Sequence, residues 1–94
     1  MVDKLELIPE KNNIRIKEQE GNYVIFNLET SGFHMLTADG NSIIEYIDGQ
    51  KNIREVAAFF STQKGLDKEQ LEQDFVKFFE DLEMRRIIKL KEPV

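Results

Sequence analysis

The fold of this chain is decided by the stretch Gly32–Ile53, GFHMLTADGNSIIEYIDGQKNI. The alternation along Phe33–Leu36 predicts a short strand, and the hydroxyl of Thr37 is suited to be the N-cap of a helix. Asp48 and Gly49 are expected to end that helix, because glycine enters the left-handed C′ conformation without steric cost. The stretch therefore joins a sheet to a set of helices.

Before this stretch, the sequence predicts a β-hairpin over Ile14–Leu28, with its turn at Glu20–Asn22. A second reversal over 29–32 leads into the strand Phe33–Leu36, and Gly32 is suited to the positive φ of a bulged turn. Side chains alternate between two faces along the second strand of the hairpin. The expected core set is Val24, Phe26 and Leu28, and the opposite set is Tyr23, Ile25 and Asn27.

After the stretch, a second helix is predicted over about residues 53–63. Asn52, followed three residues later by a glutamate, has the form of the capping box that opens it. The Lys-Gly pair at 64–65 is the expected stop, because glycine is the commonest residue at that position.

A third and longest helix is predicted over about residues 68–85. Asp67 and Gln70 repeat the spacing of a capping box at its start. Within it, Lys77 and Asp81 lie one turn apart and are suited to form an ion pair.

We expect residues 1–94 to form a single α+β domain with a three-stranded antiparallel sheet followed by a three-helix bundle. Its expected parts are an N-terminal arm over 1–13, the sheet over 14–36, the three helices over 37–86 and a tail over 87–94. Three short antiparallel strands cannot close into a barrel, so the sheet must keep open edges.

Composition narrows the class of protein. The chain has no cysteine, which excludes disulfides, thiolate nucleophiles and zinc–thiolate sites. Its net charge of −5 repels nucleic-acid phosphates. No stretch approaches the roughly 20 apolar residues that span a bilayer. The N-terminus lacks the basic and apolar regions of a signal peptide, so we expect a cytoplasmic protein.

Catalytic, cofactor and metal sites are not expected. His34 is the single histidine, and the chain has no nucleophile elbow, phosphate-binding loop or zinc-protease pattern. On a short strand, His34 is expected to point to solvent or to a partner. The carboxylates of the third helix are expected on its solvated face rather than in an acid–base pair.

Two features remain as candidate binding surfaces. The strand Phe33–Leu36 is expected to offer an open edge of backbone donors and acceptors to an added strand. The last two helices also carry a surplus of phenylalanines for so small a core. Either all of them are core residues, or some line a groove beside the sheet edge; the set is Phe59, Phe60, Phe75, Phe78 and Phe79.

Taken together, the order and spacing of these motifs resemble the PqqD-like family. That family combines a short strand ending in Leu-Asn, a spaced glycine, an apolar pair, a Leu-Asp-Gly stop and a following Ile-x-Glu-Ile/Val-Ala helix. Thr37 stands where the family usually has asparagine, and both residues are N-caps. The matching residues here are Gly32, Leu36, Thr37, Gly40, Ile43, Ile44, Ile47, Asp48, Gly49 and the run Ile53–Ala57. The resemblance extends over about residues 7–90.

The resemblance implies a winged-helix-like fold and a role as a recognition element for ribosomally made precursor peptides. In such domains the leader segment of the precursor adds as a strand beside the third strand, in the cleft next to the third helix. The domain then presents it to a modifying enzyme, often a radical SAM protein, or a leader protease in lasso-peptide pathways. The implied peptide-binding residues are Phe33, His34, Met35, Leu36, Leu71, Phe75, Phe78, Phe79 and Leu82.

The leading hypothesis is therefore a non-catalytic leader-peptide binding domain without a cofactor, expected as a monomer, with dimerisation through the open edge left open. Two alternatives remain. A winged-helix DNA-binding protein needs exposed cations on its recognition helix, where this chain offers only Arg54 and Lys64. A protein–protein adaptor without peptide cargo needs neither a leader nor DNA.

Overall fold

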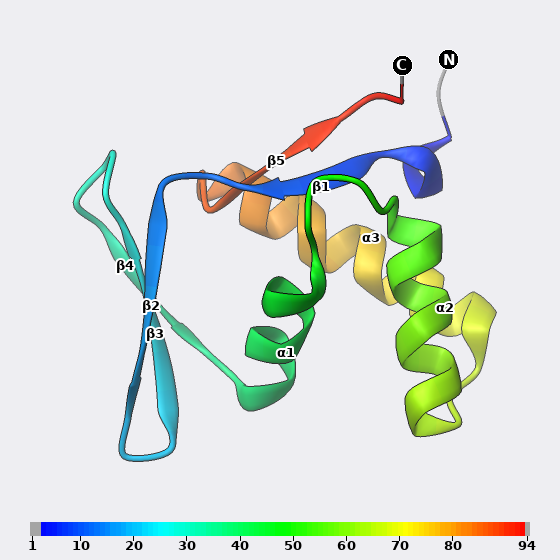
Figure 1. Ribbon diagram of the computed structural model, residues 1–94, viewed down its shortest axis with the longest axis horizontal. Helices are drawn as coiled ribbons and strands as arrows, with labels where there is room; N and C mark the ends of the chain where they lie inside the picture. Colours follow the sequence, from blue (N-terminus) through cyan, green and yellow to red (C-terminus); the bar gives the residue numbers. More distant parts are fainter. Residues whose placement is uncertain (1–2, 94) are drawn as a thin grey trace.

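The computed structural model describes residues 3–93, and within residues 14–86 its three strands and three helices follow the expected order. The three-stranded sheet lies at one end of the molecule and α2 at the other, α1 lies between them, and α3 runs from the side of α2 back toward the sheet (Figure 1). This confirms the expected α+β fold of three helices and antiparallel strands. The elements are η1 (Lys4–Glu6), β1 (Ile8–Lys11), β2 (Ile14–Gln19), β3 (Asn22–Asn27), β4 (Phe33–Leu36), α1 (Ala38–Tyr46), α2 (Ile53–Lys64), α3 (Lys68–Met84) and β5 (Ile88–Lys91).

The hairpin of β2 and β3 turns over two residues instead of the expected three. Glu20 and Gly21 both have left-handed φ angles, 54° and 83°, which is the geometry of the tight hairpin turn that matches strand twist. The shorter turn pairs Ile16 with Ile25. Because side chains alternate along a strand, a shift of one residue exchanges its two faces.

The expected core face of β3 is therefore wrong. Ile25 and Asn27 are buried, whereas Phe26 and Leu28 are exposed and Val24 is only half-buried. Burial of Asn27 is compensated by hydrogen bonds: its amide donates to the Arg86 carbonyl at 3.0 Å, and its Oδ1 accepts from the backbone N–H of Glu29 and Thr30. A buried amide with partners on both atoms does not carry the usual desolvation cost.

The reversal between β3 and β4 also differs from the expectation in one residue. Ser31, not Gly32, has the left-handed φ of 63°. The N–H of Ser31 donates to the Asn27 carbonyl at 2.8 Å, and the N–H of Asn27 donates to the Gly32 carbonyl at 2.8 Å. Two residues thus face one, which is the arrangement of a bulge.

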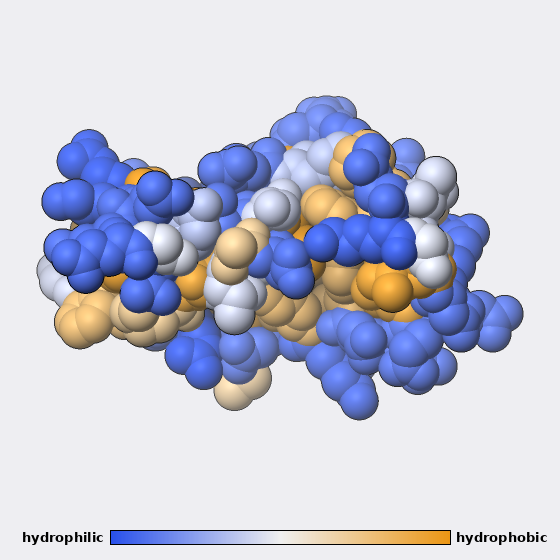
Figure 2. All heavy atoms as spheres, turned by 90° about the horizontal axis from the view of Figure 1, so that it is seen from below, coloured by the Kyte–Doolittle hydropathy of each residue, from blue (hydrophilic) through white to orange (hydrophobic). Residues whose placement is uncertain are grey.

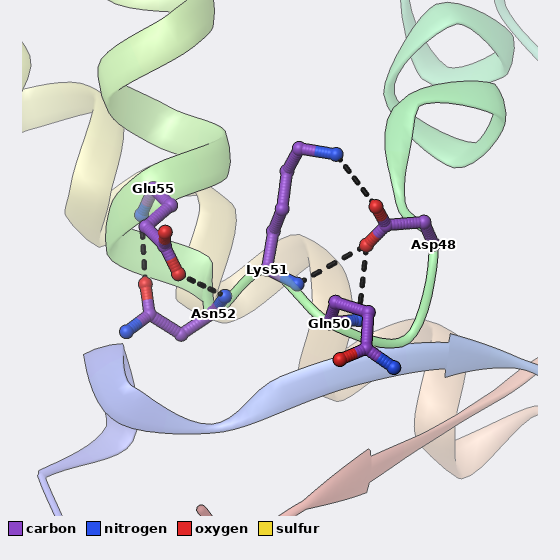
Figure 3. A network of polar contacts seen from close by, with 5 residues as sticks. All are labelled: Asp48, Gln50, Lys51, Asn52 and Glu55. Atoms are coloured by element: carbon purple, nitrogen blue, oxygen red, sulfur yellow. Dashed lines mark hydrogen bonds and ion pairs between the residues drawn. The ribbon is translucent and has the colours of Figure 1, made fainter.

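The turn between α1 and α2 is organised by Asp48 (Figure 3). α1 starts as expected, with the Thr37 hydroxyl accepting from the third residue of the turn, but it ends at Tyr46. Asp48 accepts from the N–H groups of Gln50 and Lys51, so it forms a turn of its own instead of a helix cap. Gly49 has the expected left-handed φ, in this turn. The Lys51 ammonium, followed by these N–H groups, lowers the pKa of Asp48 to about 2.

The second half of the chain follows its capping signals with two exceptions. The Asn52–Glu55 capping box and the left-handed Gly65 are present as expected. Asp67 caps α3 by accepting from the second residue of the helix, but Gln70 donates to Asp74 one turn on, so no reciprocal box forms. Asp81 pairs with Arg85 at 3.0 Å rather than with Lys77.

A second sheet joins the two ends of the chain. β1 pairs antiparallel with β5, with Ile8 opposite Lys91 and Lys11 opposite Ile88. Part of the expected N-terminal arm and tail is therefore strand, because each supplies the other's backbone partners. The first two residues of that arm and the last of the tail lie outside the described residues.

The core lies where the helices meet the inner face of the sheet. It is a single cluster whose phenylalanines contact one another edge to face, Phe60 with Phe75 and Phe75 with Phe79. Such tilted contacts suit the charge distribution of aromatic rings. None of the helices within residues 3–93 is long and apolar enough to cross a membrane. The core residues are Ile25, Ile44, Ile47, Ile53, Val56, Ala57, Phe60, Phe75, Phe79, Leu82, Ile87 and Ile88.

Candidate peptide-binding edge and cleft

The strand β4 has a partner on one side only. In the three-stranded sheet the order is β2-β3-β4, so β4 is an edge strand within the described residues. The Asn27–Gly32 pair is hydrogen-bonded, and in an antiparallel ladder bonded pairs alternate with non-bonded ones. The next bonded pair is then Ile25 with His34. It follows that the N–H and C=O groups of Phe33 and Met35 point away from β3, toward the open edge.

A cleft of about 240 Å³ lies between β4 and the C-terminal half of α3. Its walls carry alternate inner-face side chains of the strand on one side and one stripe of the helix on the other. This places apolar surface beside the free backbone groups of β4. The lining residues are Ile25, His34, Met35, Leu36, Thr37, Phe78, Asp81, Leu82, Arg85 and Ile87.

A short network of polar side chains lies at the mouth of the cleft. Arg85 donates from Nε to Asp81 at 3.0 Å, and its Nη1 lies 3.3 Å from Nδ1 of His34. A guanidinium can only donate, so Nδ1 of His34 is the acceptor in this contact. Because Arg85 bridges β4 and α3, these polar contacts help to fix the width of the cleft.

Three other hollows are present among the described residues, and none of them lies along β4. The first, of about 630 Å³, lies between η1 and the N-terminal half of α3 and is lined mostly by charged side chains. A second of about 120 Å³ lies among α1, α2 and α3. A third of about 190 Å³ lies beside the end of β1 and is lined by Glu10, Lys11, Ile47 and Asp48. The cleft at β4 is the better candidate site because the free backbone groups of β4 lie beside the apolar side chains of Phe78 and Leu82.

The structure separates the nine residues expected to bind a peptide. His34, Leu36, Phe78 and Leu82 all line the cleft, and so does Met35 at the strand edge. The side chains of Phe33 and Met35 point to the other face of the sheet and are exposed, so these two offer the edge their backbone groups.

The remaining three expected residues, all on α3, lie elsewhere. Leu71 and Phe75 line the hollow among the helices, beside Phe60. Phe79 is fully buried and contacts the rings of Phe75 and Phe78. The expectation that Phe79 lines a groove is therefore corrected: its side of α3 faces the core. Peptide contact by the residues that line the cleft stays a prediction.

Asp81 and Arg85 were missed as candidates for the site. The sequence marks Arg85 only as a cation near the C-terminal end of a helix. A usable signal was the spacing of Asp81 and Arg85, four residues apart, which favours an ion pair on one helix face. That the same face also carries Phe78 and Leu82 is visible only once α3 is placed against β4.

The described residues contain no cluster suited to hold a metal ion. Within residues 3–93, no three His, Asp or Glu side chains come together in the way a cation needs. The cleft at β4 offers a ligand backbone hydrogen bonds, apolar contact and a few polar groups.

Comparison with known proteins identifies the family. The model of the PqqD family, described as coenzyme PQQ synthesis protein D, matches residues 22–88. The chain belongs to this family. The match includes β3, β4 and all three helices, and therefore both walls of the cleft. Among curated proteins, none matches the chain significantly.

Two solved structures have a similar fold. One is the PqqD truncation of Methylobacterium extorquens PqqCD, described as a functional, stand-alone recognition element for ribosomally synthesised and post-translationally modified peptides. It has a TM-score of 0.75 at 15% identity and covers 95% of either chain. The other is TbiB1 in complex with the TbiA(beta) leader peptide, with a TM-score of 0.73, 17% identity, and coverage of 85% of this chain and 94% of TbiB1.

Proposed function

We propose that this chain binds the leader segment of a ribosomally synthesised precursor peptide and presents it to a separate modifying enzyme. The observation that carries the proposal is the open edge of β4 beside a cleft walled by α3. Strand addition at such an edge gives affinity through main-chain hydrogen bonds, and the neighbouring pockets give specificity through alternate side chains.

Family membership and the two similar structures support this function. One neighbour is described as a stand-alone recognition element, and the other is in complex with a leader peptide. The proposed direct contacts are the backbone of Phe33 and Met35 and the side chains of His34, Phe78 and Leu82. Arg85 is added to this set because it lies at the mouth of the cleft.

The finer features of the proposal follow from the family. The domain is winged-helix-like, acts without catalysis or a cofactor, and works in the cytoplasm as a monomer. Its partner enzyme is a radical SAM protein or a leader peptidase of the lasso-peptide kind. The proposal assigns recognition to this chain and chemistry to that partner.

The charge pattern of α2 speaks against the DNA-binding alternative. Arg54 pairs with Asp3 at 3.5 Å, and Lys64 pairs with Asp39 at 3.1 Å. A recognition helix needs cations that are free to reach phosphates or base edges. Here the two cations named as candidates already face carboxylates of the same chain.

The test is an NMR titration of the isotope-labelled chain with the leader peptide encoded nearest to its gene. Shifts are expected in β4 and in the segment from Phe78 to Arg85. Met35→Pro should weaken leader binding by about tenfold or more, because it removes one edge N–H and crowds the incoming strand. Proline is tolerated at an exposed strand edge, so the variant should fold.

Met35→Ala is the matched control, because it removes the same side chain and keeps the N–H. It should bind the leader with close to wild-type affinity. An unchanged affinity in a folded Met35→Pro variant would contradict strand addition at β4. Shifts confined to the hollow near η1 would place the peptide elsewhere.

A further inference from the structure

The outer face of the three-stranded sheet is apolar and uncovered. Four of its side chains are largely exposed: Phe33 (66%), Met35 (64%), Leu28 (50%) and Phe26 (39%). We call these four residues the outer-face patch. The rings of Phe26 and Phe33 lie 6.4 Å apart, so the patch is continuous from β3 to β4. Figure 2 shows hydrophobic atoms at the surface on the end of the molecule that carries the sheet. Such patches on soluble proteins commonly mark interaction sites.

The charged strand positions on the outer face of the sheet are of one sign. β2 contributes Arg15 opposite Phe26 and Lys17 opposite Val24, both on this outer face. Neither cation forms an ion pair within residues 3–93. No strand position on this face carries a carboxylate, although the chain has 18 acidic against 13 basic side chains. The face is therefore apolar and basic on an acidic protein, and it matches a partner with an apolar surface bordered by carboxylates.

A second copy of the chain is a poor match for this face. In a two-fold dimer the same surface meets itself, so each copy would bring Arg15 and Lys17 to a face whose strand positions offer no carboxylate in return. The leader peptide is a poor match as well. A strand added at β4 lies beside Phe33 and Met35, but Phe26 and Leu28 are separated from it by β4 itself.

We infer that the outer face of the sheet docks the peptide-modifying enzyme, through an apolar surface of that enzyme bordered by carboxylates. The inference rests on the proposed function. A leader strand added at β4 extends the same sheet, so its outward side chains continue the surface that starts at Phe33 and Met35. An enzyme seated on the outer-face patch is thereby adjacent to the leader.

The experiment measures two affinities separately, by biolayer interferometry at two salt concentrations. The probes are the purified modifying enzyme encoded nearest to the gene of this chain and the synthetic leader peptide encoded there. One variant combines Phe26→Ser and Leu28→Ser, which leaves β4 intact. A second combines Arg15→Glu and Lys17→Glu, which keeps the apolar residues. Enzyme binding is measured with and without the leader.

Two controls match these variants away from the sheet. Met84→Ser removes an apolar side chain that is 83% exposed at the end of α3. Lys68→Glu reverses a charge in the first turn of that helix. Both controls should bind the enzyme like the wild type. Circular dichroism of every variant establishes that it is folded.

The expected result is weaker binding of the enzyme with unchanged binding of the leader. The serine variant should bind the enzyme about tenfold more weakly or worse, because apolar anchors dominate interface energies. The glutamate variant should bind it several-fold more weakly, with less sensitivity to salt. Both should bind the leader within about twofold of the wild-type affinity, because their substitutions lie outside the cleft.

Three results would overturn the inference. Enzyme affinity that is unchanged in both variants excludes docking on this face. Leader affinity that falls in parallel means that the patch contacts the peptide. A wild-type dimer that becomes monomeric in the variants means that the patch binds a second copy. If the wild type binds no leader at all, the proposed function fails, and the enzyme measurement without leader still tests the docking face.

Discussion

The two faces of the three-stranded sheet differ in burial although both carry apolar side chains. On the inner face, Ile25 is fully buried beside a buried Asn27. On the outer face, Phe26 lies between them in sequence and is exposed. Hydrophobicity alone favours the outer set, which is larger and more aromatic. The comparison teaches that register and a polar anchor decide which face is buried.

The largest effect on stability is expected from the inner-face member of one adjacent pair, Ile25 and Phe26, whose side chains lie on opposite faces of the sheet. Ile25→Ala should lower the free energy of unfolding by about 2–5 kcal/mol, because it leaves a cavity in the core. Phe26→Ala, the neighbouring control, should change it by less than about 1 kcal/mol although it removes more atoms. Urea unfolding measures both, and equal losses would contradict the assignment of the two faces.

Asn27 tests whether the polar anchor contributes to the choice of face. Asn27→Ala should cost about 1–3 kcal/mol, because the Arg86 carbonyl and the N–H groups of Glu29 and Thr30 lose their partner. Asn13→Ala, at an exposed asparagine in the loop between β1 and β2, should cost much less stability. Thermal unfolding compares the two variants. Equal stability of the two variants would mean that the strand register alone decides which face of the sheet is buried.

The smallest expected effect is on the pKa of Tyr23, which lies on the inner face of the sheet opposite Glu18. The hydrogen bond to Glu18 and then its charge raise the pKa of Tyr23 above 10.0. The neutral phenol is thus favoured in the folded state. This contribution to stability is present below the unfolded pKa of 10.0 and is lost as the pH rises through the folded pKa.

Glu18→Gln should lower the pKa of Tyr23, because it removes the negative charge that opposes ionisation. Carbon-13 NMR of the Tyr23 ring across alkaline pH measures the midpoint. Glu29→Gln, at the other end of the sheet, is the control and should leave it unchanged. The same midpoint in Glu18→Gln and wild type would refute the pairing.

Much of the fold could be predicted from capping and turn signals. The N-cap at Thr37, the Asn52 box and the stop at Gly65 are local patterns, and each is present. The wrong prediction of the buried face of β3 has one cause. A turn of three residues over Glu20–Asn22 pairs Ile16 with Phe26, whereas the observed turn pairs it with Ile25. A single residue in a turn thereby exchanged the buried and the exposed face, which no count of apolar residues reveals.

The candidate site was predictable in its strand and less so in its helix. The open edge at β4 follows from the strand count and from the chain order. The wall on α3 depends on the angle at which the helix meets the sheet. Phe78 and Phe79 are neighbours in sequence, yet one lines the cleft and the other is buried in the core. Periodicity alone cannot separate two residues that both lie near a broad apolar stripe.

The pairing of β1 with β5 has a mechanical consequence. The ladder places Ile8 opposite Lys91, so both outer ends of the chain leave from the same end of the ladder. A force that pulls the two ends apart acts across its hydrogen bonds one pair at a time, like a zipper, instead of shearing all of them together. Once residues 3–7 are released from α2 and α3, rupture of the ladder should therefore begin at Ile8 and Lys91 under low load. It should then proceed toward Lys11 and Ile88, while β4 and its cleft are still folded.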